Sequence, residues 1–241
     1  MSTVYLIPSP LAEDGIQAIH RSTIDAIKNC SVFFVENDRT TRRYFKELWR
    51  TFLPGEQIVI DNYEWFVIED GQATADAFKK QIRNNKVIGI ISEAGCPGVA
   101  DPGQALVAIA QQQNLKIIPL VGPNSILLAL MASGMNGQQF QFLGYLPIDN
   151  KERSKAIRDL EAESARKNST QIFIETPYRN TQMLETLLFH CKPATLLCIA
   201  VDITSKNEIV RTKTIAQWQK EKSDLHKKPA IFLIYAGEQG K

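Results

Sequence analysis

The sequence predicts an α/β protein built from two α/β domains with mostly parallel sheets. Short apolar runs alternate with helical patterns almost from end to end of the 241 residues. This alternation is typical of parallel strands joined by crossover helices. The chain is long enough for one large or two small domains with buried cores, and its 44% apolar content is that of an ordinary globular protein.

Eight apolar runs are the expected strands. They are rich in β-branched and aromatic residues and short enough for buried strands rather than helices. In the first half of the chain they cover residues 4–7, 32–35, 87–91 and 116–121, and in the second half residues 141–146, 171–175, 196–201 and 230–236.

Helical patterns fill the segments between these runs. Ile16, Ile19, Ala26 and Ile27 fall on one face of a helical stretch. Residues 151–167 predict a second helix, and their six basic and four acidic side chains are typical of a solvated surface.

The favoured domain junction is Val121-Gly122-Pro123, directly after the fourth strand. It divides the chain into an N-terminal α/β domain, residues 1–121, and a C-terminal α/β domain, residues 122–241. A rise in charge density near Pro147 marks an alternative boundary.

A polar residue or glycine followed by proline recurs where a strand run gives way to a helical pattern. Such pairs suit the N-cap and the first helical position. At the carboxyl ends of strands, where open α/β sheets bind ligands, they predict a shared ligand cleft; the simpler alternative is that they only start helices. The pairs are Ser9-Pro10, Asp101-Pro102, Gly122-Pro123 and Thr176-Pro177, the second with Gln104 placed as in a capping box.

Several common site types are missing from the sequence. It contains no P-loop, no Gly-x-Gly-x-x-Gly after the first strand and no Gly-x-Ser-x-Gly elbow. Its three histidines are scattered and its four cysteines form no Cys-x-x-Cys pair, so no metal site is expected. A net charge of +2 does not by itself indicate a nucleic-acid partner.

The sequence also predicts a cytoplasmic protein with no membrane partner. No run approaches the length of a membrane span, and the first residues lack the basic start and apolar core of a signal peptide. The cysteines are expected to be reduced, mostly as small core residues.

One loop is longer than a strand-to-helix turn requires. Residues 91–103, ISEAGCPGVADPG, hold three glycines, two prolines, two carboxylates and a cysteine, whereas such turns need only about two to six residues. This composition indicates a loop that holds a ligand.

That loop resembles the Ser-Asp-Ala-Gly-Thr-Pro-x-x-Ser-Asp-Pro-Gly loop of the tetrapyrrole methylase superfamily, in its branch of ribosomal RNA small subunit 2′-O-ribose methyltransferases. Five more segments resemble that branch in the same order and spacing, over nearly the whole chain. They are YLIPSPL at 5–11, VENDRTTRRYF at 35–45, VGPNSILLALMASGM at 121–135, FLGYLP at 142–147 and FIETPYR at 173–179.

The resemblance implies a homodimer of two-domain subunits with S-adenosylmethionine in the cleft between the domains. An apolar slot with backbone partners and no phosphate nest suits this cofactor. Val99 and Ile126 could instead be plain core residues, and Cys96 is interpreted as a small pocket-lining residue rather than a reactive thiol. The residues carried over as cofactor contacts are Pro8, Gly95, Cys96, Val99, Ser125, Ile126, Thr176, Pro229 and Ala230.

A ribose hydroxyl acceptor requires a group that helps to remove its proton. The segments that match the family offer carboxylates at Glu36, Asp38, Glu93, Asp101 and Glu175. We favour Glu36 as the catalytic carboxylate, with Arg39 beside it. Asp101 is better interpreted as a helix cap, and Asp38 could equally cap the helix that starts near Arg39.

Basic residues near the same helix start suggest contacts with RNA phosphates. Arg43 and Arg179 are the expected substrate-binding residues, whereas Arg42 is expected on a solvated helical face. The family's Glu-Asp-Thr-Arg-His is replaced here by residues 36–40, ENDRT, and an arginine of the family is missing from residues 201–206, VDITSK.

The leading function is therefore S-adenosylmethionine-dependent 2′-O-ribose methylation of small-subunit ribosomal RNA, with ribosomal RNA or the small ribosomal subunit as substrate. Two alternatives stay open. One is methylation of a small molecule such as a tetrapyrrole, and the other is a non-catalytic S-adenosylmethionine-binding protein.

Overall fold

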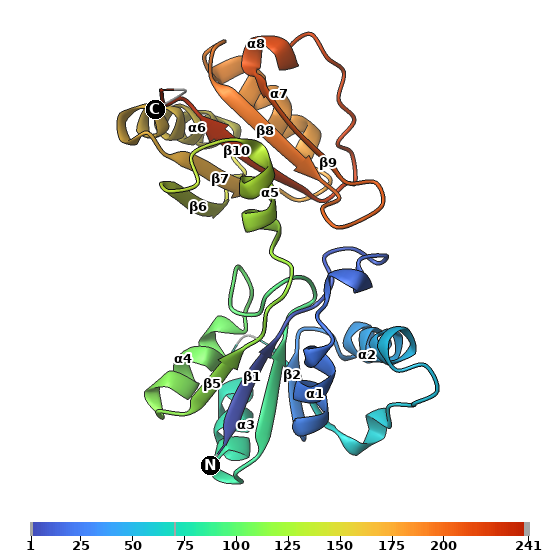
Figure 1. Cartoon of the computed structure of the whole chain (residues 1–241). Helices are drawn as coiled ribbons and strands as arrows, with labels where there is room; N and C mark the ends of the chain where they lie inside the picture. The colour runs from blue at the N-terminus through green and yellow to red at the C-terminus, as the bar shows by residue number, and fades with distance from the viewer. Residues whose placement is uncertain (1, 70, 239–241) are drawn as a thin grey trace. The chain divides into compact units, whose positions relative to one another are not determined.

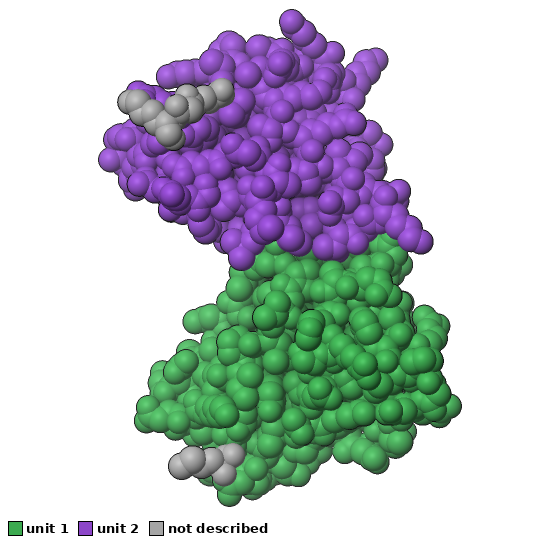
Figure 2. All heavy atoms as spheres, viewed as in Figure 1, with its two compact units in different colours: residues 1–124 green, residues 125–241 purple. Residues whose placement is uncertain are grey.

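The chain forms two compact units, residues 1–124 and residues 125–241 (Figure 2). The computed structural model describes residues 2–69 and 71–238. Each unit has its own five-stranded sheet and its own buried core. The predicted junction at residues 121–123 lies directly before the division between the units.

The sheet of the first unit is parallel throughout, in the order β3-β2-β4-β1-β5. A wholly parallel sheet needs helices on both faces, which explains why every residue of β2 is buried. The strands are β1 (Thr3–Ile7), β2 (Val32–Val35), β3 (Glu64–Val67), β4 (Val87–Ile91) and β5 (Lys116–Pro119).

Helices cover both faces of this sheet (Figure 1). Successive residues of β2 point to opposite faces. Phe33 therefore packs edge-on against Phe45, with ring centroids 5.1 Å apart, while Phe34 packs edge-on against Phe78 at the same distance on the other face. The helices are α1 (Ser22–Asn29) and α2 (Asp38–Phe52) on the first face, and α3 (Gln72–Arg83) and α4 (Gln104–Gln112) on the second, with 3₁₀ turns at η1 (Ile16–Ala18) and η2 (Ile60–Asn62).

The second unit has a mixed sheet, in the order β6-β7-β10-β8-β9. Only β6 and β7 pair in parallel, and the other three pairings are antiparallel. The prediction of an α/β fold with two sheets is confirmed, but the expected parallel character is wrong for this sheet. Residues 202–208 join β8 to β9 and are too few for a parallel crossover. The strands are β6 (Phe140–Tyr145), β7 (Thr170–Ile174), β8 (Leu196–Val201), β9 (Ile209–Thr214) and β10 (Ala230–Tyr235).

The charged helix of the second unit is more than a solvated surface. Glu161 is buried and accepts hydrogen bonds from the Lys192 amide (2.7 Å) and the Thr195 hydroxyl. Arg153 is also buried and donates to the carbonyl of Ile148 (3.0 Å). The helices of this unit are α5 (Ser125–Ser133), α6 (Asn150–Lys167), α7 (Asn180–His190) and α8 (Ile215–Trp218). No helix among residues 2–69 and 71–238 is long and apolar enough to cross a membrane.

The four proline pairs do not cap helices as predicted. The assigned helices begin after them, at Gln104, Ser125 and Asn180, and the residues after Ser9-Pro10 form turns before η1. The cap of α2 is Asn37 rather than Asp38, because its side chain accepts from the amides of Arg39 and Thr40. The proline pairs instead lie in the segments that connect the strands to the helices.

Gly89, at the centre of β4, has no room for a side chain. A Cβ atom there would lie 2.5 Å from Cδ1 of Phe33, whose ring is fully buried and held by aromatic neighbours. We predict that Gly89→Ala lowers the free energy of unfolding by roughly 1–3 kcal/mol through overpacking, as measured by urea unfolding. Gly137→Ala is the control, because a Cβ there meets nothing within 4 Å. Equal stability of the two variants would contradict the prediction.

Candidate functional site

The carboxyl ends of β1 and β4 are tied together by backbone hydrogen bonds. These strands pair in parallel, so the turns after them meet at one edge of the sheet. The Ser9 amide donates to the Gly95 carbonyl (2.8 Å) and the Gly95 amide donates to the Ser9 carbonyl (3.0 Å). The Ser9 hydroxyl also donates to the carbonyl of Ser92 (2.7 Å). The loop after β4 is therefore fixed to the turn after β1.

Asp101 organises the loop after β4 from within. Its carboxylate accepts from the amides of Gly98 (2.8 Å) and Gly103 (2.7 Å). Burial raises the pKa of this carboxyl, and the two amide bonds oppose that shift. Gly95 and Gly98 both have positive φ, which favours glycine. Asp101 thus holds the loop in shape rather than capping α4.

Cys96 lies between this loop and the segment that leaves β5. Its thiol is close to the carbonyl oxygens of Gly122 (3.7 Å) and Pro123 (3.5 Å). Burial raises the pKa of the thiol. A raised pKa lowers the thiolate fraction at neutral pH, which agrees with the interpretation of Cys96 as a lining residue.

Gly122 approaches Pro8 closely. A Cβ at Gly122 would lie 2.1 Å from Cβ of Pro8, so only glycine fits. The buried Tyr44 hydroxyl donates to the carbonyl of Pro8 (2.9 Å) and fixes the same turn from α2. Pro8, Gly95 and Cys96 are thereby brought together, and Val99 is an exposed apolar residue of the same loop.

Glu36 follows β2 and is tied to the loop after β4. Its Oε1 accepts from the Glu93 amide (2.9 Å). Burial raises the pKa of Glu36, the Glu93 amide opposes that shift, and the nearby charges of Asp101 and Glu93 add to it. A carboxylate with a raised pKa is a stronger proton acceptor than an ordinary one.

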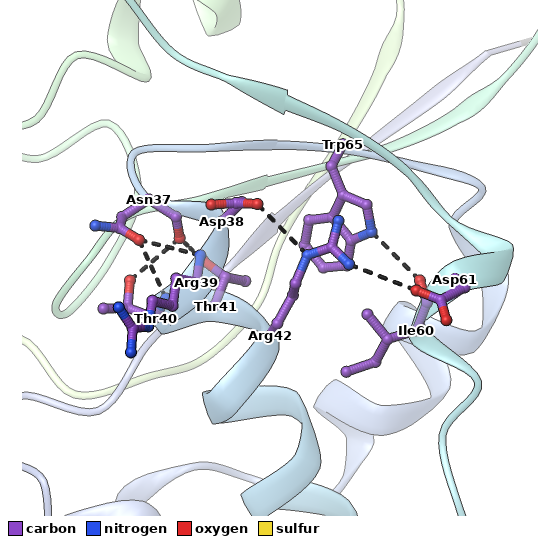
Figure 3. A network of polar contacts seen from close by, with 9 residues as sticks. All are labelled: Asn37, Asp38, Arg39, Thr40, Thr41, Arg42, Ile60, Asp61 and Trp65. Atoms are coloured by element: carbon purple, nitrogen blue, oxygen red, sulfur yellow. Dashed lines mark hydrogen bonds and ion pairs between the residues drawn. The ribbon is translucent and has the colours of Figure 1, made fainter.

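Thr40 connects this pair to α2. Its hydroxyl lies 3.1 Å from the Asn37 carbonyl and 3.3 Å from Oε1 of Glu93. The Asn37 side chain accepts from the amides of Arg39 (3.0 Å) and Thr40 (3.2 Å), and so fixes the start of the helix (Figure 3). Sequence reasoning missed Thr40 and Asn37 because the family's segment has other residues there.

The three arginines at this helix start differ in their surroundings. Arg42 lies over the Trp65 ring, 4.8 Å from its centroid, and within 3.6 Å of Asp38 and of Asp61 (Figure 3). Arg42 is therefore part of the packing. The expectation that it lies on a solvated helical face is wrong. Arg39 and Arg43 are exposed.

A hollow of about 540 Å³ lies beside these residues. One wall is the segment after β1, another is α2, and Glu93 with Ala94 completes it. The lining residues are Pro10, Leu11, Ala12, Glu13, Thr40, Arg43, Tyr44, Glu47, Glu93 and Ala94.

In the second unit, the predicted residues Thr176, Pro229 and Ala230 lie near adjacent ends of two neighbouring strands, β7 and β10. Ile174 pairs with Ile231 in antiparallel register, so the residue that follows β7 lies beside those that precede β10. Ser125 and Ile126 form the first turn of α5.

Arg179 is held by a buried carboxylate. Its Nε and Nη2 donate to Oε1 of Glu175 at 2.9 and 2.6 Å, and the Glu175 side chain has no exposed surface. The same oxygen accepts from the Thr176 amide (2.6 Å). Arg179 is therefore less available to a substrate than the exposed Arg43.

No metal cluster accompanies these groups. Within the described part of the chain, no set of three or more His, Cys, Asp or Glu side chains could hold a metal ion.

Known proteins resemble the chain in sequence. The ribosomal RNA small subunit methyltransferase I of Vibrio cholerae is 28% identical over 98% of this chain and 79% of its own length. The protein of the same name from Campylobacter fetus is 33% identical over 65% of this chain and 56% of its own length. No family model matches the chain.

Solved structures resemble it in fold. Diphthine synthase superposes with a TM-score of 0.63 at 14% identity, covering 98% of this chain and 90% of its own. The methyltransferase CobJ superposes with a TM-score of 0.62 at 15% identity, covering 97% and 93%. The chain has the tetrapyrrole methylase fold. The predicted resemblance is confirmed, and the likenesses support a methyltransferase that uses S-adenosylmethionine.

The environment of Cys96 predicts a slow thiol. Because its pKa is raised, its thiolate fraction at pH 8 is below that of a free cysteine, whose pKa is about 8.5. We expect alkylation by iodoacetamide to be slower than that of glutathione at pH 8 and to accelerate as pH rises. Mass spectrometry measures the rate of alkylation at Cys96. The Cys96→Ser variant is the control, because any alkylation that it still shows comes from the three buried cysteines. Alkylation of Cys96 as fast as that of glutathione would favour a reactive thiol.

Proposed function

We propose that this chain methylates a ribose 2′-hydroxyl of small-subunit ribosomal RNA with S-adenosylmethionine as methyl donor. The names of its sequence relatives supply the substrate class. The observation that carries the reaction type is Glu36, a half-buried carboxylate of raised pKa tied to the loop that follows β4.

The residues of that loop fit the cofactor. Gly98 leaves open space around its backbone, Val99 offers an exposed apolar side chain, and Asp101 holds the loop through two amides. An apolar surface with free backbone suits adenine and an amino-acid end. We assign Pro8, Gly95, Cys96 and Val99 of the first unit as cofactor contacts, together with Ser125, Ile126, Thr176, Pro229 and Ala230 of the second.

When bound, the cofactor supplies an electrophilic methyl group. The chain's own contribution is to orient the acceptor and to take up its proton. The Glu93 amide holds Oε1 of Glu36, which leaves Oε2 for the acceptor hydroxyl. Thr40, hydrogen-bonded to Glu93, keeps that side chain in place beside Glu36.

Arginines hold the acceptor strand in this proposal. Arg39 lies at the start of α2, a few residues from Glu36, and its exposed guanidinium is assigned to the acceptor nucleotide. Arg43 is assigned to a neighbouring phosphate. Arg179 is a secondary contact, since Glu175 already engages two of its nitrogens.

Two parts of the proposal concern the state of the protein in the cell. The free cysteines favour a reducing compartment, so we assign the protein to the cytoplasm. We also propose a homodimer, supported by an apolar stripe on α5 where Leu127 is 48% and Met131 79% exposed, one helical turn apart.

Methyl transfer tests the reaction. Labelled methyl from S-adenosylmethionine is expected on a ribose of purified small ribosomal subunits that lack their native methylations. Glu36→Gln removes the proton acceptor, and we expect kcat to fall about 10²–10⁴-fold while cofactor affinity, measured by calorimetry, is retained. Because burial raises the pKa of Glu36, the wild-type rate should fall on acidification through that raised value.

The outcomes separate the alternatives. Label on a tetrapyrrole but not on RNA would replace the substrate class. Tight cofactor binding without transfer to either acceptor would identify a non-catalytic binder. Full activity of Glu36→Gln with label on a ribose would keep the substrate and remove Glu36 from its role.

Sedimentation tests the dimer. The chain has a mass of 27.1 kDa, and sedimentation equilibrium of the wild-type protein is expected to give twice that mass. Met131→Lys places a charge in the apolar stripe and should yield monomers. Phe189→Lys is the matched control, because Phe189 is 82% exposed on a different helix, α7. A wild-type monomer, or a Met131→Lys dimer, would contradict the proposed interface.

A further inference from the structure

The outer face of α2 carries a row of four basic side chains, and the proposed function gives a role only to the first two, Arg39 and Arg43. Arg39, Arg43, Lys46 and Arg50 follow one another at intervals of four, three and four residues, and all are exposed. At 3.6 residues per turn they fall within an arc of about 60°. We call these four residues the α2 basic stripe.

The stripe lies opposite the buried face of the helix. Thr41, Tyr44, Phe45, Leu48 and Trp49 form that buried face. The fifth basic residue, Arg42, is set apart from the stripe, because it stacks on Trp65 between Asp38 and Asp61 (Figure 3). The helix thus separates one structural arginine from four basic residues that face solvent.

The stripe is only weakly neutralised. Arg43 pairs with Glu13 at 3.6 Å and Arg50 with Glu47 at 3.8 Å, and both arginines keep most of their side-chain surface exposed. Exposed pairs of this kind contribute little to stability, so a phosphate can displace the carboxylate. Among the residues that the structure describes, Arg39 and Lys46 form no ion pair.

The stripe leads to the candidate site. Its first residues, Arg39 and Arg43, flank Thr40, whose hydroxyl contacts Glu93 beside Glu36. Arg43 also lines the hollow of about 540 Å³ that includes Glu93. Farther along, Lys46 and Arg50 line a second hollow of about 490 Å³. The row from Arg39 to Arg50 spans about 16 Å at 1.5 Å per residue, enough for several phosphates of one strand.

We infer that the α2 basic stripe binds the phosphate backbone of the RNA substrate and leads the strand towards Glu36, with Lys46 and Arg50 as the contacts most distant from the site. The inference rests on the proposed function. α2, which is described along its whole length, contributes none of the exposed large hydrophobic side chains. A charged row without apolar anchors fits a polyanion better than a membrane or a protein hot spot.

Salt-dependent RNA binding tests the inference without any chemistry. The probe is a fluorescein-labelled single-stranded RNA of mixed sequence, titrated by anisotropy at several salt concentrations. Lys46→Gln/Arg50→Gln should weaken binding about tenfold at low salt and reduce the slope of log affinity against log salt by about 1.4, or about 0.7 per lost phosphate contact.

The control changes the same residue types elsewhere in the same unit. Lys80→Gln/Arg83→Gln removes one exposed lysine and one exposed arginine from the last turn of α3 and should leave the affinity and the slope unchanged. Cofactor affinity, measured by calorimetry, should be unchanged in both double variants. Transfer to unmethylated small subunits should show a raised KM and an unchanged kcat for Lys46→Gln/Arg50→Gln.

Each contrary outcome has a distinct meaning. If the wild type binds RNA and the stripe variant binds equally well, the inference is overturned while the proposed function stands. Equal losses in the stripe and control variants would also overturn it, since the effect would then follow net charge alone. If the wild type binds no RNA, both the inference and the RNA substrate fail. Loss of binding to vesicles of phosphatidylglycerol and phosphatidylcholine, with RNA binding intact, would assign the stripe to a membrane instead.

Discussion

The candidate site depends on the clamp between the ends of β1 and β4. Two reciprocal backbone hydrogen bonds join Ser9 and Gly95, and the Ser9 hydroxyl adds a third to the Ser92 carbonyl. Because the strands are parallel, their carboxyl ends lie at the same edge of the sheet. The clamp holds the two segments that follow these ends in a fixed relative position. Glu36 is then tied to this geometry through the Glu93 amide. The clamp thus fixes the loop after β4 to the turn after β1, while the Glu36–Glu93 hydrogen bond fixes it to the end of β2.

Much of the fold could be predicted because the central strands are buried on both faces. β2, β4 and β8 have the bounds expected from their apolar runs, since the burial of nearly every residue leaves a continuous hydrophobic signal. β3 and β9 were missed because they lie at sheet edges, where exposed positions admit charged residues such as Glu64 and Arg211. The direction of strand pairing in the second unit carried no comparable signal, because burial alone does not distinguish parallel from antiparallel neighbours.

The sequence located the strand ends that carry the candidate site, but not the roles of all the residues there. Proline pairs mark strand ends well, but each helix begins at least two residues after the proline, so the prediction that these pairs cap the helices was wrong. The roles of Asp101 and Arg42 could not be predicted from sequence, because each depends on partners distant in the chain or on loop geometry. Asp101 binds two amides of its own loop, and Arg42 stacks on Trp65, which belongs to β3. Local pattern reports a residue's chemical type, whereas long-range packing decides whether the residue is structural or available.

The site combines two electrostatic demands that oppose each other. A proton acceptor of raised pKa requires burial and neighbouring negative charge, which Glu36 receives from its position and from Asp101 and Glu93. The same negative charge repels a polyanionic substrate. Since the whole chain carries a net charge of only +2, general attraction cannot overcome that repulsion, and the compensation has to be local. α2 meets both demands, because Thr40 in its first turn contacts Glu93 while its outer face carries the basic stripe. The basic stripe can then attract the RNA strand at a distance from the carboxylates. Glu36 thereby keeps the buried, negatively charged environment that makes it a stronger proton acceptor than an ordinary carboxylate.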